Sequence, residues 1–268
     1  MARIAGDKPY YTFVLKNEGT GRYHQDVAIK LYSVTTIIKA TIAAPQLVPW
    51  AYKVTRDHIS GLVGVLNEEG VGPEEILDML SDEAMLAEYM KDNKLRPEDL
   101  RDAAAERGTT EHAFLEHLAT LALLDEEHAM AAAYDAVDGI TLVTGYGQAI
   151  AGWWIAKHPH VVESETVLYS LKHGYCGSVD LIWKDDEGTT ILTDLKTGNE
   201  NRKPYATDHI QVDGYADAYR EMHGEQTIDR TSVLIAREDG TWQEEETTLP
   251  RGTFLSVLDV YSRLKEAR

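Results

Sequence analysis

The chain has 268 residues, of which 43% are hydrophobic and 26% are charged, and its formal net charge is −19. This length and composition suit one large globular domain with a substantial core. The charge disfavours a protein that binds nucleic acid over its whole surface, because phosphate binding relies on Lys and Arg. The single cysteine, Cys176, excludes an internal disulfide and any zinc or iron–sulfur site that needs several thiolates.

No run of residues approaches the roughly 18 apolar residues that a membrane span requires. The N-terminal sequence "MARIAGDKPYYTF" has no apolar stretch after its basic residues. We therefore expect a soluble, cytoplasmic protein with no membrane partner.

The first 158 residues are predicted to be mainly helical after a short β start. Two strands flank the turn "NEGTG", and a β-branched run then passes into a helix of apolar period. Two prolines at first-turn positions open further helices. The expected order is strands at 10–17 and 22–33, then helices at 46–66, from Pro73, from Pro97, at 126–137 and at 145–158.

Residues 159–268 are predicted to form a small sheet with flanking helices. The polar turn "DDEG" separates two apolar runs and marks a hairpin. The expected strands are 161–170, 175–184, 189–196, 230–237 and 242–249, with helices from Pro204 to His223 and from about Gly252. Such a layered core is of the α/β (α+β) class. Without a repeat or a low-complexity linker, a single domain over 1–268 is the simplest interpretation.

Two acidic runs, 67–93 and 237–248, carry much of the negative charge. Runs of this kind usually form solvated faces. We expect both to be exposed.

The hairpin places charges where strands are usually apolar. Asp194 and Lys196 are two residues apart on one strand, so their side chains share a face while Leu195 points into the opposite layer. A turn over residues 185–189 puts Asp180 opposite Asp194, with Cβ atoms roughly 4.5 to 5.5 Å apart. Facing carboxylates repel, which suggests an intervening Mg²⁺ or Mn²⁺ ion. Alternatively, the aspartates are polar residues at strand ends and Lys196 is a salt-bridge partner.

The order of "GSVD", "DLK" and "QVDGY" resembles that of the PD-(D/E)XK nuclease superfamily, in particular its RecB-like exonuclease branch. Upstream, "RGTTEHAFLE" is similar to the Gly-x-x-x-His element of that branch, and "ESETVLYS" supplies an acidic residue one strand earlier. The segments "YSVTTII" and "LVPWAYKV" are similar to the start of phage-encoded members. The resemblance runs from about Tyr32 to Tyr219 and implies a restriction-endonuclease-like core.

The resemblance also implies a metal site that holds Mg²⁺ or Mn²⁺. In it, Asp180 and Asp194 bind the ion, aided by His112 and the backbone carbonyl of Leu195. Lys196 then lies beside the attacking water and stabilises the developing negative charge. The iron–sulfur cysteines of several relatives are absent, so no such cluster is expected.

Three further residues receive supporting roles from the resemblance. Glu165 would bind a second metal or assist proton transfer, and Gln211 and Tyr215 would position the scissile phosphate or Lys196. The residues of the Gln-x-x-x-Tyr pair share one helical face. Glu163 competes with Glu165, because both lie on one side of a strand.

Several residues of this region also have an ordinary structural interpretation. A lone helical histidine such as His112 is more often a surface or core residue than a ligand. Tyr219 is expected to pack in the core. The pair Trp153-Trp154 could stack on bases but is expected to be core.

The function that the resemblance implies is a metal-dependent deoxyribonuclease, an exonuclease on single- or double-stranded DNA ends in phage recombination or replication. A structure-selective endonuclease and a catalytically silent platform for DNA or a recombination partner are the alternatives. No Gly-x-x-x-x-Gly-Lys-Ser/Thr motif is present, so a helicase or a single-strand annealing protein is the expected partner in the bacterial host cell. The candidate phosphate contacts are Arg101, Arg107, Lys172, Arg202 and Lys203.

Overall fold

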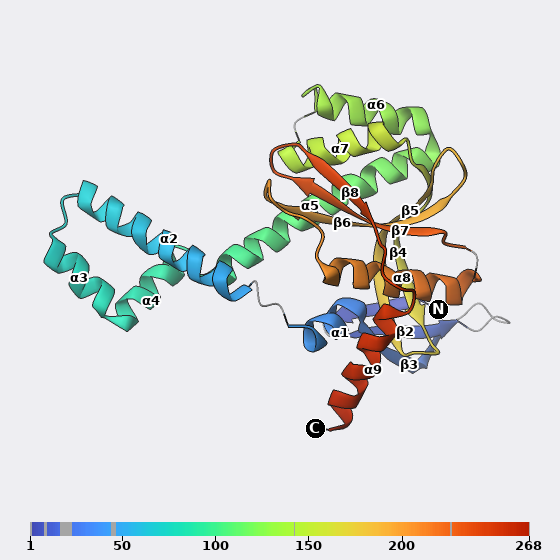
Figure 1. Ribbon diagram of the computed structural model, residues 1–268, viewed down its shortest axis with the longest axis horizontal. Coiled ribbons are helices and arrows are strands. Elements are labelled where there is room, and N and C mark those ends of the chain that lie inside the picture. Colours follow the sequence, from blue (N-terminus) through green and yellow to red (C-terminus); the bar gives the residue numbers. More distant parts are fainter. Residues whose placement is uncertain are drawn as a thin grey trace. The chain divides into compact units, whose positions relative to one another are not determined.

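The computed structural model describes residues 2–7, 10–16, 23–43, 47–141, 143–225 and 227–267 (Figure 1). The chain forms two compact units, residues 44–110 and residues 1–43 with 111–268. The prediction of a single domain over 1–268 stays a prediction. No helix of the described residues is both long enough and apolar enough to cross a membrane.

The smaller unit is helical. It contains α2 (Leu47–Glu68), α3 (Pro73–Ser81), α4 (Glu83–Asp92) and the first part of α5 (Pro97–Leu124). Pro73 begins α3, as its fixed φ angle favours. Asp82 caps α4 by accepting the backbone N–H of Met85 at 3.0 Å. Most described side chains of the acidic run 67–93 are exposed or half-buried, as predicted.

The larger unit is built on a mixed sheet of eight strands within the described residues. Its strand order is β1-β2-β3-β5-β6-β7-β8, and β4 pairs with β5. Five of the described strand pairings are antiparallel, whereas β3–β5 and β6–β7 are parallel. The strands are β1 (Ala2–Asp7), β2 (Tyr10–Lys16), β3 (Tyr23–Ser33), β4 (His160–Ser170), β5 (Tyr175–Lys184), β6 (Thr190–Gly198), β7 (Arg230–Arg237) and β8 (Trp242–Glu246).

Helices cover both faces of this sheet, which gives the mixed α/β architecture expected from the sequence (Figure 1). One core lies against α1 (Val34–Thr41), α8 (Ala206–His223) and α9 (Thr253–Glu266). The other lies against the second part of α5, α6 (Glu126–Val137) and α7 (Gly145–Lys157). Trp153 and Trp154 are fully buried in the second core, so they are core residues, as predicted.

Strand β5 changes partner along its length, and this change creates a fork in the sheet. One edge of β5 pairs with β4 from Tyr175 to Lys184. The other edge pairs with β3 at residues 175–176 and with β6 at residues 181–184. Residues 177–180 therefore face the point where β3 and β6 separate, and side chains at this point can approach one another without a strand between them.

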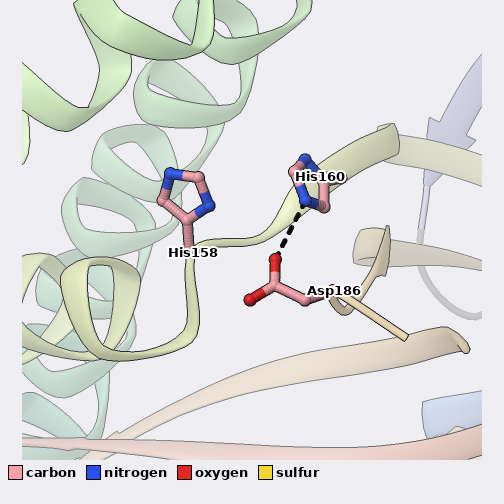
Figure 2. A group of neighbouring side chains, drawn as sticks. All are labelled: His158, His160 and Asp186. Carbon is pink, nitrogen blue, oxygen red and sulfur yellow. Dashed lines mark hydrogen bonds and ion pairs between the residues drawn. The ribbon is translucent and has the colours of Figure 1, made fainter. Parts of the chain in front are cut away.

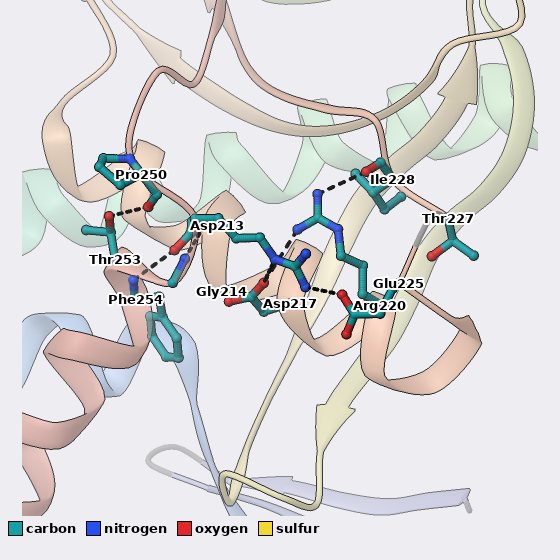
Figure 3. A network of polar contacts seen from close by, with 12 residues as sticks. Asp213, Gly214, Asp217, Arg220, Glu225, Thr227, Ile228, Pro250, Thr253 and Phe254 are labelled. Carbon is teal, nitrogen blue, oxygen red and sulfur yellow. Dashed lines mark hydrogen bonds and ion pairs between the residues drawn. The ribbon is translucent and has the colours of Figure 1, made fainter.

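A polar network attaches the start of α9 to α8 (Figure 3). The Asp213 carboxylate accepts the backbone N–H groups of Gly252 and Phe254 at 3.2 and 2.8 Å. These N–H groups lie at the start of a helix, where they have no backbone acceptor within the helix. Gly252 has a positive φ of 80°, which suits glycine. Asp217 binds Arg220 and Arg251, and Arg220 also donates to the carbonyl of Ile228. The network fixes α9 on the face of the sheet that α8 covers.

The structure adds or corrects three features. Strand β1 and helix α1 were not predicted as separate elements, because the β-branched run after Ser33 hides a helix start capped by the Ser33 hydroxyl. The sheet adds a parallel pairing of β6 with β7, for which the predicted helix α8 provides the crossover. In the second acidic run, Glu244 was expected to be exposed, but its side chain is 10% exposed. It accepts hydrogen bonds from Trp153 and Ser232 and pairs with Lys157.

Candidate active site

The β5–β6 hairpin, which carries Asp180, Asp194 and Lys196, has the strand register that the sequence predicts. Leu181 pairs with Thr193, and the turn is closed by a hydrogen bond from the Asp185 N–H to the Thr189 carbonyl at 3.2 Å. The next pair would be Asp180 with Asp194, but the ladder ends before it. Instead, the Asp180 carboxylate accepts the backbone N–H of Leu195 at 2.5 Å. A side chain thus replaces the strand ladder at the fork.

Asp194 lies at the centre of a second set of contacts. Its Oδ1 accepts the Gln211 amide at 3.0 Å, and its Oδ2 lies 2.5 Å from the Lys196 ammonium. Gln211 also donates to the Tyr215 hydroxyl at 2.8 Å. The two residues lie four positions apart on α8, as the predicted shared face requires. Leu195 is fully buried in the opposite core, as the strand alternation predicts.

His112 lies on α5 and reaches across to the hairpin. Its Nδ1 is 3.3 Å from the Asp180 carboxylate, and its Nε2 is 3.2 Å from the Leu195 carbonyl oxygen. Both neighbours are acceptors. Burial acts to lower the pKa of His112, but the Asp180 charge and hydrogen bond outweigh it and raise the pKa to about 9. His112 is therefore a cation at neutral pH when no metal ion is bound.

The two glutamates of β4 have different surroundings. Glu165 has a positive φ of 49°, accepts the Ser178 hydroxyl at 3.5 Å and lies with His112 and Asp180. Glu163 instead accepts the hydroxyl of Tyr219, which is buried. Burial, followed by repulsion from Asp180, raises the pKa of Glu165 to about 7.

The buried charges shift one another's pKa values in opposite directions. Burial acts to raise the pKa of Asp180, but the charges of His112 and Lys196 hold it below its usual range. Burial raises the pKa of Asp194 despite the Lys196 ammonium. Burial acts to lower the pKa of Lys196, but the Asp194 and Asp180 carboxylates outweigh it and raise that pKa. Lys196 therefore stays protonated.

These residues fit a divalent cation. Ligand atoms of His112, Glu165 and Asp180 lie within 4.8 Å of one another, and the Leu195 carbonyl oxygen lies 3.2 Å from the His112 Nε2. Asp194 lies outside this group, in contact with Lys196 and Gln211. Its buried Oδ2 is ion-paired with the Lys196 ammonium but has no hydrogen-bond partner of regular geometry among the described residues. Carboxylate and carbonyl oxygens with one imidazole are a donor set for Mg²⁺ or Mn²⁺.

Two residues of this region were not anticipated from the sequence. Glu116 lies one helical turn after His112, and its charge contributes to the raised pKa of Glu165. The i,i+4 spacing from His112 was the available signal. Gly177 lies under Tyr215, and an added Cβ there would be 2.3 Å from the tyrosine ring. The close contact explains why a glycine occupies this strand position.

The candidate phosphate contacts have different surroundings. Lys172 lines a pocket together with Asp217 and Glu221. Arg202 is paired with Asp208 at 2.6 Å, whereas Lys203 is exposed. The side chains of Arg101 and Arg107 lie outside the described part of the chain.

The family model described as PD-(D/E)XK nuclease superfamily matches residues 86–251, which is more than half of the chain. The chain belongs to this superfamily. Membership in the PD-(D/E)XK nuclease superfamily implies a nuclease that uses divalent metal ions. The matched segment contains all of the candidate site residues discussed above.

No curated protein matches the chain. Among solved structures, the crystal structure of SSO0001 is 17% identical, with a TM-score of 0.31, over 40% of this chain and 50% of that one. The alignment thus spans half the length of SSO0001. A similarity of this size carries no information on the activity of this PD-(D/E)XK protein.

Proposed function

We propose that this protein is a Mg²⁺- or Mn²⁺-dependent deoxyribonuclease of the RecB-like branch, an exonuclease that acts on DNA ends in phage recombination or replication. The observation that carries the proposal is the fork in the sheet. There, the buried carboxylates of Asp180 and Asp194 and the Lys196 ammonium converge. Repelling carboxylates of this kind are costly to bury unless cations compensate them. The order of sequence motifs supports the assignment to this branch.

His112, Glu165, Asp180 and the Leu195 carbonyl would hold the cation, with Asp194 beside them. When bound, a divalent cation polarises a phosphoryl oxygen and lowers the pKa of a coordinated water. The carboxylates would also be relieved of their mutual repulsion.

The remaining side chains would stabilise charge, hold one another in position and transfer protons. Lys196 stays protonated and would stabilise the negative charge that develops on the phosphate. Asp194 holds the Lys196 ammonium, and Gln211 holds Asp194, so these contacts fix the position of the charge. When it is not bound to the ion, Glu165 has a pKa of about 7, so it exchanges a proton near neutral pH and is suited to assist proton transfer.

The net charge of −19 restricts how DNA would be held. Contacts would come from a local patch and from the bound cation rather than from the whole surface. Binding should consequently be modest and should weaken steeply with salt. Unwinding would come from a helicase partner, and a single-strand annealing protein is the alternative partner, in the cytoplasm of a bacterial host.

The test is cleavage of end-labelled linear DNA and covalently closed circular DNA with Mg²⁺, Mn²⁺ or EDTA. An exonuclease degrades only the linear DNA, and only with a metal ion. Nicking of the circles would replace the exonuclease assignment with that of a structure-selective endonuclease. Absence of cleavage with every metal ion would refute the nuclease proposal and favour a DNA-binding platform.

A further inference from the structure

A second group of potential metal ligands lies away from the fork. It consists of His158, His160 and Asp186, whose ligand atoms are all within 4.8 Å of one another. Figure 2 shows that the two imidazoles, which belong to one stretch of chain, lie beside the Asp186 carboxylate from a second segment. His158 is the C-cap of α7, His160 begins β4, and Asp186 belongs to the turn of the β5–β6 hairpin. None of the three takes part in the proposed nuclease chemistry.

The backbone brings these side chains to neighbouring positions. His158 adopts a left-handed conformation, with φ 48° and ψ 56°, where helix α7 ends. Pro159 follows and separates it from His160. The two rings are consequently not parallel but nearly perpendicular, at 87°, with centroids 5.5 Å apart. Such an arrangement allows both imidazoles to direct a nitrogen toward one point.

The distances suit a small tetrahedral ion. The His160 Nε2 lies 3.2 Å from the Asp186 Oδ1. Two ligand atoms that are each roughly 2.0–2.1 Å from a tetrahedral Zn²⁺ are about 3.3 Å apart. The observed separation therefore matches that of two ligands of one ion. A ring nitrogen of the exposed His158 lies within 4.8 Å of ligand atoms of the other two residues and provides the third ligand.

A further contact resembles the outer support of metal-bound histidines. The second nitrogen of His160, Nδ1, lies 2.9 Å from the Glu126 carboxylate, at the start of α6. A ligating histidine commonly donates its other N–H to a carboxylate, which orients the ring and strengthens it as a ligand. Glu126 thus occupies the supporting position while Nε2 faces Asp186.

We propose that His158, His160 and Asp186 form a binding site for Zn²⁺ or a similar divalent transition-metal ion, with Glu126 orienting His160. Two imidazoles and a carboxylate select such ions over Mg²⁺, which prefers oxygen ligands. The site is partly exposed, so the ion has an entry path. A bound ion would connect α7, β4 and the turn of the hairpin that carries Asp180 and Asp194.

The same contacts would also occur without a metal ion if a protonated His160 formed ion pairs with both carboxylates, an arrangement called the protonated clamp below. The hydrogen bond to Glu126, followed by that to Asp186, raises the pKa of His160 in the metal-free protein. A clamp and a metal site differ in their need for His158. The clamp uses only His160, whereas the metal site requires both rings.

The experiment is calorimetric titration of the full-length protein with Zn²⁺ in excess Mg²⁺, which occupies oxygen-rich sites. The variants are His158→Asn, chosen because asparagine tolerates the left-handed backbone, and Asp186→Asn. The control is Asp180→Asn at the proposed nuclease site. We expect both test variants to weaken Zn²⁺ binding by at least about tenfold and the control to leave one Zn²⁺ site intact.

Two further measurements distinguish the loss of a metal ligand from misfolding of the variant. The melting temperature of each variant without metal should match that of the wild type, and Zn²⁺ should raise it only where His158 and Asp186 are intact. Co²⁺ should give the intense visible absorption of a tetrahedral site in the wild type but not in His158→Asn. Zn²⁺ binding that is unchanged in His158→Asn, or absent from the wild type, would overturn the proposal and leave the protonated clamp.

Discussion

The Asp180 carboxylate accepts the backbone N–H of Leu195, the residue between Asp194 and Lys196, at 2.5 Å. This hydrogen bond replaces the strand pairing that ends at Leu181 and Thr193. It leaves the Asp194 side chain in contact with Lys196 and Gln211 on the buried side of the fork. The arrangement explains how two aspartates and a lysine coexist in the interior of a sheet, and it leads to the following predictions.

Asp194→Asn should strongly reduce cleavage while it preserves the fold. The substitution keeps the volume of the side chain but removes the charge that holds Lys196. We expect activity to fall by about 10²- to 10³-fold, the size of effect seen when one electrostatic contact is lost from an active site. Steady-state cleavage and thermal unfolding measure the two properties. Cleavage within about threefold of wild type would contradict the role of Asp194.

Gly177→Ala should weaken both stability and activity. The new Cβ would lie 2.3 Å from the Tyr215 ring, so the ring must move, and its contact with Gln211 would be disturbed. We expect a loss of about 1–3 kcal/mol in the free energy of unfolding and a fall in activity.

Gly152→Ala is the matched control, because its Cβ would meet Trp242 only at an ordinary 3.5 Å. Urea denaturation and cleavage of both variants provide the comparison. Equal stability of the two alanine variants would argue against close packing of Tyr215 on Gly177.

The metal-free protein should lose stability as the pH rises from 6.5 to about 9. The pKa of His112 is about 9 in the folded state and ordinarily 6.5, so the folded state binds the additional proton in this interval. The contribution of His112 is therefore complete below pH 6.5 and disappears as the pH passes 9.

Urea unfolding in EDTA at several pH values measures this effect, with His112→Gln as the comparison. The wild type should show a larger decline between pH 6.5 and 9 than the variant does. Parallel pH profiles would indicate that His112 has no raised pKa.

Asp213→Ala should destabilise the protein without changing its cleavage chemistry. Asp213 accepts two backbone N–H groups at the start of α9, and loss of a helix cap costs about 0.5–2 kcal/mol. Asp259→Ala is the control, because Asp259 forms an exposed pair with Arg263 and should matter by less than about 1 kcal/mol. A smaller effect at Asp213 than at Asp259 would contradict the capping role.

Local patterns predicted much of the hairpin. Turn residues around Asp185 set the register, and the alternation of side chains placed Asp194 and Lys196 on one face and Leu195 in the core. The break in the ladder could not be predicted, because it depends on where a side chain of one strand finds a backbone donor of the next.

Longer-range features could not be predicted from the sequence for a similar reason. The burial of Glu244 requires that β8 pair with β7 and place this residue beside Trp153 and Ser232, none of which is adjacent in sequence. The same holds for the choice between Glu163 and Glu165. Their partners, Tyr219 and His112, lie on helices far along the chain.

The most direct test of the central claim concerns Lys196. Metal-dependent cleavage of linear DNA should be compared for the wild type, Lys196→Ala and Lys184→Ala, an exposed lysine on the same hairpin. We predict that Lys196→Ala loses turnover but still binds the metal ion, as measured by calorimetry, and that Lys184→Ala cleaves normally. Cleavage by Lys196→Ala at the wild-type rate would contradict the assignment of this fork as the active site.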